Sequence, residues 1–149
     1  LKSSHTITTA ATVRETSATL AAGAELIIRE KIYTHGKQLA KTDFSVDLNG
    51  EGAGADIVSR SVAAENSRQE FEMRINGNEK CHGHSECDAI IMDDAHVTAV
   101  PALAANCVDA ELIHEAAIGK IAGEQLLKLM TLGLTEHEAE EQIIKGFLS

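Results

Sequence analysis

The stretch Phe71-Glu72-Met73-Arg74-Ile75 alternates strictly between apolar and charged side chains. An earlier stretch, Phe44-Ser45-Val46-Asp47-Leu48, shows the same alternation with smaller polar residues. A period of two places one set of side chains on the buried face of a β-strand and the other set in solvent. The two stretches therefore predict half-buried strands, and they set the expected fold class as mainly β.

Further short apolar runs precede residue 115, and turn signals such as Asn49-Gly50 and Asn76-Gly77-Asn78 separate them. No segment in this region keeps a helical period of about 3.6 residues. The additional predicted strands are Thr6–Thr9, Glu25–Tyr33, Asp56–Val62, Ala89–Met92, His96–Val100 and Glu111–Ile113.

The composition narrows the choice among β architectures. Short strands at roughly regular spacing are compatible with a sandwich, a barrel or a β-helix. Aromatic residues make up only 3% of the 149 residues, proline occurs once, and small and β-branched residues are abundant. No repeat of roughly 20–25 residues is visible, but a core of small side chains favours thin, closely stacked coils.

The region after residue 115 changes to helical spacing. Apolar side chains recur there at Ile118, Ile121, Leu126, Leu129 and Met130. Thr135-Glu136-His137-Glu138 predicts a capping box that opens a second helix, on which Ile143 and Phe147 share one face. We therefore expect a β core over residues 1–114 and a C-terminal helical hairpin over 115–149. One apolar stripe of the hairpin would dock on the β core and the other would face a partner, or both would cover the core.

Charge and cysteine content limit the function classes. The net charge is −10, and most of it lies in residues 81–149. An acidic surface repels nucleic acid and anionic membranes, so neither is expected as a partner. No apolar run approaches the roughly 20 residues that a membrane helix needs. Three cysteines, an odd number, do not indicate a secreted disulfide framework, so we expect a cytoplasmic protein.

The densest group of candidate ligands is Cys81-His82-Gly83-His84-Ser85-Glu86-Cys87-Asp88. Thiolates and imidazoles bind zinc and iron–sulfur species. The spacing between the two cysteines is too long for a zinc knuckle. On a strand they would share one face, unless Gly83 breaks the register. The alternative is that Cys87 is a small buried core residue.

A second candidate site is the pair His114-Glu115, at the expected junction between strand and helix. An imidazole beside a carboxylate could bind a metal, and an exposed polar turn is the alternative. The pair lacks the second histidine of a zincin motif. Cys107 and His96 are further candidate soft ligands. No nucleophile elbow, phosphate-binding loop or dinucleotide fingerprint occurs in the sequence.

Several motifs in residues 81–149 occur together in a specific order. They are Cys87-Asp88-Ala89-Ile90-Ile91-Met92-Asp93-Asp94, Ala99-Val100-Pro101, Ile113-His114-Glu115-Ala116, Gly119-Lys120-Ile121, Glu124-Gln125-Leu126, Gly133-Leu134-Thr135-Glu136 and Ile144-Lys145-Gly146-Phe147. As a series they resemble the C-terminal half of the SufB/SufD family, the scaffold proteins of the SUF iron–sulfur assembly system. Residues 1–80 resemble this family only in style.

The resemblance implies a right-handed parallel β-helix with a C-terminal α-helical hairpin. It implies a scaffold for a transient iron–sulfur cluster that is not an enzyme by itself. Cys87 matches the proposed sulfur acceptor or cluster ligand of the family, and Glu115 and His114 match residues thought to join it. The chain departs from the pattern at Ile113, where SufB usually has an acid, and it is much shorter than SufB.

The resemblance also implies partners. A SufC-type ATPase would dock on the helices, where the candidate contact residues are Leu126, Leu129, Met130, Ile143 and Phe147. A second copy or a SufB/SufD paralogue would pair with the chain as a dimer, and a cysteine desulfurase system would donate sulfur. Two alternatives stay open. One is a protein that binds zinc or another metal through Cys81, His82, His84 and Cys87, and the other is a structural module that binds an ATPase without cluster chemistry.

Overall fold

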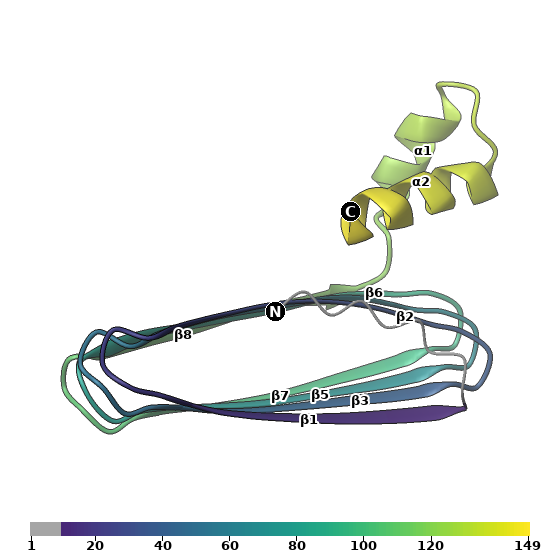
Figure 1. Cartoon of the computed structure of the whole chain (residues 1–149). Helices are drawn as coiled ribbons and strands as arrows, with labels where there is room; N and C mark the ends of the chain where they lie inside the picture. The colour runs from purple at the N-terminus through teal and green to yellow at the C-terminus, as the bar shows by residue number, and fades with distance from the viewer. Residues whose placement is uncertain (1–9) are drawn as a thin grey trace.

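The computed structural model describes residues 10–149 as a parallel β-solenoid of stacked coils followed by two helices (Figure 1). The elements are β1 (Ala11–Leu20), β2 (Glu25–Thr34), β3 (Leu39–Leu48), β4 (Gly54–Ala63), β5 (Arg68–Gly77), β6 (Cys81–Ile91), β7 (His96–Ala105), β8 (Ala110–Gly119), α1 (Gly123–Met130) and α2 (Glu136–Leu148). Odd-numbered strands form one sheet and even-numbered strands the other, and all pairs are parallel. The predicted parallel β-helix with C-terminal helices is confirmed.

Each coil brings the chain back to the same position in the next layer of the stack. Ala11 pairs with Leu39 in this way, and Leu39 pairs with Arg68. This period is longer than the roughly 20–25 residues at which the sequence shows no repeat. The coils also repeat in shape and not in residue identity, since Phe44 stacks on Met73 and Met73 on Pro101. The repeat is therefore hidden from a comparison of the core residue types.

The core lies between the two sheets and follows the period-two pattern. Phe44, Val46 and Leu48 of β3 are at most 1% exposed, and the inner residues of β5 are also buried. The rings of Phe44 and Phe71, on neighbouring coils, meet edge to face with their centroids 5.9 Å apart. Side chains at alternating positions are excluded from water, so burial of apolar area stabilises the stack. The strands predicted at 44–48 and 71–75 are confirmed.

The other predicted strands at 25–33, 56–62, 89–92, 96–100 and 111–113 fall within β2, β4, β6, β7 and β8, apart from Met92, which directly follows β6. The prediction at 6–9 lies outside the described residues. Strand β1 was not predicted, because its inner positions carry Thr12, Arg14, Thr16 and Ala18, which give no apolar alternation. Parallel pairing with β3 along its whole length nevertheless holds this segment in the sheet.

Asparagine side chains reinforce one corner of the solenoid. Asn78 donates from Nδ2 to Oδ1 of Asn49 over 2.6 Å, and Asn106 donates to Oδ1 of Asn78 over 2.7 Å. The three residues occupy the same turn in three successive coils. This amide ladder fixes the coil-to-coil register where the backbone leaves the sheet.

The helical segment begins later than residue 115. Strand β8 stays paired with β6 as far as Ile90 and Gly119, and α1 starts only at Gly123. Ile118, which fits a helical spacing in the sequence, is therefore a strand residue, because the hydrogen bonds to β6 outweigh local helical propensity. Within residues 10–149, neither helix is long and apolar enough to cross a membrane.

Helix α2 opens with the predicted capping box and packs on the outer face of the even-numbered sheet (Figure 1). The hydroxyl of Thr135 accepts from the backbone N–H of Glu138 over 3.3 Å, and the Glu138 carboxylate accepts from the backbone N–H of Thr135 over 2.8 Å. Ala139 of α2 and Val62 of β4 are both fully buried. The Nζ of Lys31 donates to the carbonyl of Ser149, which ties the last residue to β2.

Replacing Thr135 with alanine is expected to loosen α2 without unfolding the solenoid. Loss of an N-cap hydroxyl costs about 1 kcal/mol, so amide hydrogen exchange in the first turns of α2 should accelerate about fivefold. Thr131→Ala is the matched control, because the Thr131 hydroxyl donates only to the Lys128 carbonyl at the end of α1. Equal exchange of the α2 amides in both variants would contradict the capping role.

Candidate functional site

The cysteine and histidine side chains of strand β6 lie on opposite faces of the even-numbered sheet. Cys81 and Cys87 are buried on the inner face, whereas His82 and His84 lie on the outer face. The prediction that the two cysteines share a face is confirmed, since Gly83 stays within the regular pairing. The four residues of the zinc alternative do not converge on one point within the chain, because consecutive strand positions face opposite ways.

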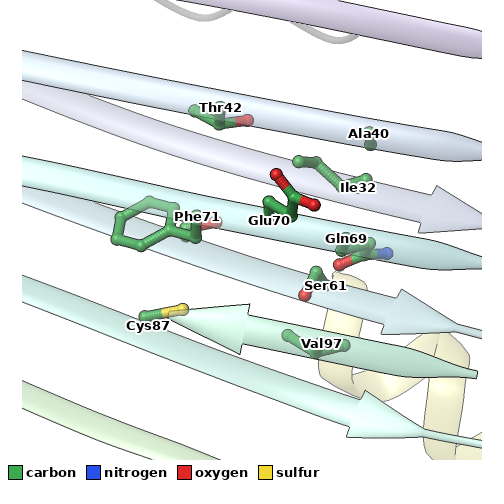
Figure 2. A pocket seen from close by; sticks show the side chains of 10 residues that line it. Ile32, Ala40, Thr42, Ser61, Gln69, Glu70, Phe71, Cys87 and Val97 are labelled. Carbon is green, nitrogen blue, oxygen red and sulfur yellow. The ribbon is translucent and has the colours of Figure 1, made fainter. Parts of the chain in front are cut away.

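Cys87 lies against a small cavity between the sheets, lined also by Thr42, Ser61, Gln69 and Phe71 (Figure 2). Cys87 is only 2% exposed to solvent. Burial, with a smaller contribution from the charge of Asp88, raises the pKa of the Cys87 thiol to about 11. The thiol is therefore protonated at neutral pH and reacts only when it becomes accessible and loses its proton.

His114 of β8 faces the same interior as Cys87. His114 pairs in register with Ser85 of β6, and the Ser85 hydroxyl is hydrogen-bonded to Nδ1 of His114. Cys87 lies two positions further along β6 and pairs with Ala116. Among the described residues, Nε2 of His114 is buried and has no hydrogen-bond partner. Burial lowers the pKa of His114, and the nearby charge of His84 lowers it further. The result is a neutral imidazole with one nitrogen left unused inside the solenoid.

Glu115 lies on the outer face and contacts a different set of residues. His84 donates from Nδ1 to Oδ1 of Asp56 over 2.8 Å and from Nε2 to Oε2 of Glu115 over 3.1 Å. Hydrogen bonds to Asp56 and then to Glu115 raise the pKa of His84. Of the three residues predicted from the family resemblance, Cys87 and His114 share the inner face and Glu115 is separated from them by the sheet.

The remaining candidate ligands are dispersed. Cys81 is buried, and burial raises the pKa of its thiol. Cys107 is half-buried in the connection between β7 and β8. On the outer surface, Nε2 of His82 lies 3.4 Å from Oε1 of Glu25, and His96 is exposed at the start of β7.

Asp56, which lies near His84, was not predicted as a site residue, and Glu86 was part of the candidate ligand group at 81–88 without being singled out. Asp56 lies on β4 and stacks beside His84, and Glu86 stacks beside Glu115. The members of each pair lie one full coil apart in the chain, so no local motif connects them. Only the coil period, once known, places them together.

The hairpin exposes different apolar residues from most of those predicted. Leu126, Leu129, Ile143 and Phe147 are half-buried, because α1 packs on α2 and α2 packs on β4. Met130 is 41% exposed and is the exception among the predicted contact residues. Leu127 and Leu132, which were not predicted, are 63% and 78% exposed.

Comparison with known families decides the assignment. The family described as SUF system FeS cluster assembly, SufBD core domain, matches residues 3–147. The chain belongs to the SufBD family. The resemblance that the motifs of residues 81–149 indicated is confirmed, and the match extends over the N-terminal coils as well.

Curated SufBD relatives include archaeal proteins. An iron–sulfur cluster assembly SufBD family protein of Methanothermobacter thermautotrophicus is 41% identical over 106 residues, which are 70% of this chain and 26% of that protein. The corresponding protein MJ0034 of Methanocaldococcus jannaschii is 37% identical over 122 residues, which are 81% of this chain and 39% of that protein. The chain therefore spans between a quarter and two fifths of the length of these relatives.

Proposed function

We propose that this SufBD chain is a scaffold component for iron–sulfur cluster assembly that accepts sulfur at Cys87. One observation carries the proposal: the thiol of Cys87 and the unpartnered Nε2 of His114 face the same interior from neighbouring strands. Thiolate and imidazole are ligands that iron–sulfur species accept. A transient cluster is the cargo of such a scaffold. Because Glu115 lies across the sheet from Cys87 and His114, its carboxylate can join the cluster only after β8 leaves its place beside β6.

The sulfur-accepting step follows from thiol–disulfide chemistry. The Cys87 thiolate attacks the outer sulfur of a persulfide on a donor protein, such as a cysteine desulfurase system. A new sulfur–sulfur bond forms on Cys87, the donor's sulfur–sulfur bond breaks, and the donor leaves as a thiolate. The high pKa of the buried thiol opposes this attack, so access to water and a base must come first.

Exposed apolar residues of the hairpin support one of the proposed partners. A SufC-type ATPase would bind the hairpin, where Leu127, Met130 and Leu132 expose apolar area. A second copy or a SufB/SufD paralogue would pair with the solenoid as a dimer. The acidic net charge of −10 argues against a nucleic acid as a partner, and reduced thiols are consistent with a cytoplasmic location.

Anaerobic reconstitution tests the proposal. With ferrous iron, cysteine and a cysteine desulfurase, the chain should acquire the visible absorbance of an iron–sulfur species and a persulfide that mass spectrometry locates on Cys87. Cys87→Ala should lose both signals, and Cys107→Ser is the control that should keep them. Absorbance that survives in both Cys87→Ala and Glu115→Ala would overturn the site assignment.

A structural module that only binds an ATPase is the second candidate, and the exposed apolar residues of the hairpin favour it. Because β8 ends at Gly119, deletion of residues 120–149 removes the helices without shortening the solenoid. If a variant without cysteines still binds the ATPase and the deletion variant does not, the hairpin is the docking element. Loss of reconstitution together with retained binding would favour this second function.

A further inference from the structure

The outer face of the even-numbered sheet carries a compact group of metal-ligating side chains. One ligand atom from each of His84, Glu86 and Glu115 lies within 4.8 Å of the others. His84 and Glu86 are two positions apart on β6, and Glu115 stands directly opposite Glu86 on β8. The strand alternation thus brings an imidazole and two carboxylates to one face, while Cys87 lies on the other.

Asp56 sets the orientation of the imidazole. It accepts the hydrogen bond from Nδ1 of His84, and Nε2, which is directed towards Glu115, gives up its proton when a metal binds. Asp56 is itself fixed by an ion pair with Arg29. A carboxylate behind one ring nitrogen is the usual arrangement of a histidine whose other nitrogen binds a metal.

The carboxylates of this face are placed at an electrostatic cost. Glu86 and Glu115 are like charges directly opposite each other on adjacent strands, an arrangement that destabilises a sheet. Asp88 adds a third negative charge on the same face of β6. The guanidinium nitrogen Nη2 of Arg60 lies 3.9 Å from Oε1 of Glu86 and offsets part of this negative charge. A cation between Glu86 and Glu115 would remove the repulsion directly.

We propose that His84, Glu86 and Glu115 bind a divalent transition-metal cation of the Fe²⁺, Mn²⁺ and Zn²⁺ class on the outer face of the solenoid. One nitrogen and two carboxylate oxygens suit these cations, and the cysteine thiols that would favour a soft metal lie on the inner face. The Nε2 of His84 already lies 3.1 Å from Oε2 of Glu115, so two of the three ligand atoms are close enough to share one cation. The use of this site to hold iron for cluster assembly rests on the proposed function; cation binding itself does not.

Titration of the chelator-treated full chain with Mn²⁺, followed by electron paramagnetic resonance of the free ion, tests the site. One Mn²⁺ should bind per chain, and Fe²⁺ added without oxygen should displace it. His84→Ala, Glu86→Gln and Glu115→Gln should each weaken Mn²⁺ binding about tenfold or more. His82→Ala is the matched control, because His82 lies on the same face of β6 and pairs with Glu25 outside the group. Cys87→Ala should also leave the Mn²⁺ affinity unchanged.

The absence of stoichiometric Mn²⁺ and Fe²⁺ binding would overturn the proposal, as would unchanged affinity in a His84→Ala, Glu86→Gln double variant. Far-UV circular dichroism identifies a variant that fails to fold, and the isosteric Glu86→Gln then provides the decisive comparison. Persulfide formation on Cys87 is measured separately and without metal. If the persulfide forms while Mn²⁺ does not bind, the proposed function is supported and the metal site is refuted. If Mn²⁺ binds while no persulfide forms, the sulfur role is refuted and the metal site is supported.

Discussion

Cys87 is expected to react with iodoacetamide at pH 7 at least about 100-fold more slowly than Cys107 in the folded chain. A pKa of about 11, against an ordinary value of 9.0, lowers the thiolate fraction about 100-fold. Burial of the Cys87 side chain slows the reaction further, whereas Cys107 is only half-buried. Mass spectrometry of the labelled cysteine peptides as a function of time measures both rates in one sample.

The pH dependence separates protonation from simple shielding. The labelling rate of Cys87 should keep rising between pH 7 and 10, because the reactive thiolate is still a minor species throughout this range. In denaturant, the rates of Cys87 and Cys107 should converge, since burial no longer distinguishes them. Equal rates in the native chain at pH 7 would show that the interior around Cys87 is open to water.

Replacing Phe44 with alanine is expected to lower the free energy of unfolding by about 3–5 kcal/mol. Phe44 is 1% exposed, meets Phe71 edge to face, and lies under the guanidinium of Arg14, which is 5.4 Å from the ring centroid. Alanine would leave a cavity between three coils that the rigid sheets fill only partly. Urea denaturation followed by circular dichroism measures the loss.

Val13→Ala is the control for Phe44→Ala. Val13 is 60% exposed on the outer face of β1, so its truncation should change the free energy of unfolding by less than about 0.5 kcal/mol. A similar, small effect of both substitutions would mean that the aromatic contact between coils contributes little. In that case the solenoid would depend mainly on its backbone ladders.

The architecture could be predicted where the side chains follow the pleat of the sheet. The alternations at 44–48 and 71–75 have large apolar residues on one side only, so they specify strand and burial together. Strand β1 escaped prediction because Thr12 and Arg14 occupy inner positions, and its pairing with β3 comes from the stack and not from its own pattern. The start of α1 was misplaced for the same reason, since pairing with β6 extends β8 through Ile118.

The site was predictable in its residue types but not in its geometry. Cys87, His114 and Glu115 were predicted as one site from the family resemblance, and no pattern in the sequence places them relative to one another. Their separation over two faces depends on the exact register, in which Cys87 pairs with Ala116 and not with Glu115. Asp56 could be placed beside His84 only with the coil period, which the residue types of the strands do not reveal.

The position of β8 at the end of the stack of described strands affects when the Cys87 thiol becomes accessible. Each coil is held by its neighbours, and β8 pairs with β6 on one side only among the described strands. In such a one-dimensional stack, the terminal coil frays at a lower free energy than the coils inside it. Fraying of β8 would uncover Cys87 while β1 to β5 stay assembled. The thiol is thus one coil from solvent, and a partner that binds β8 would control when the thiol becomes accessible.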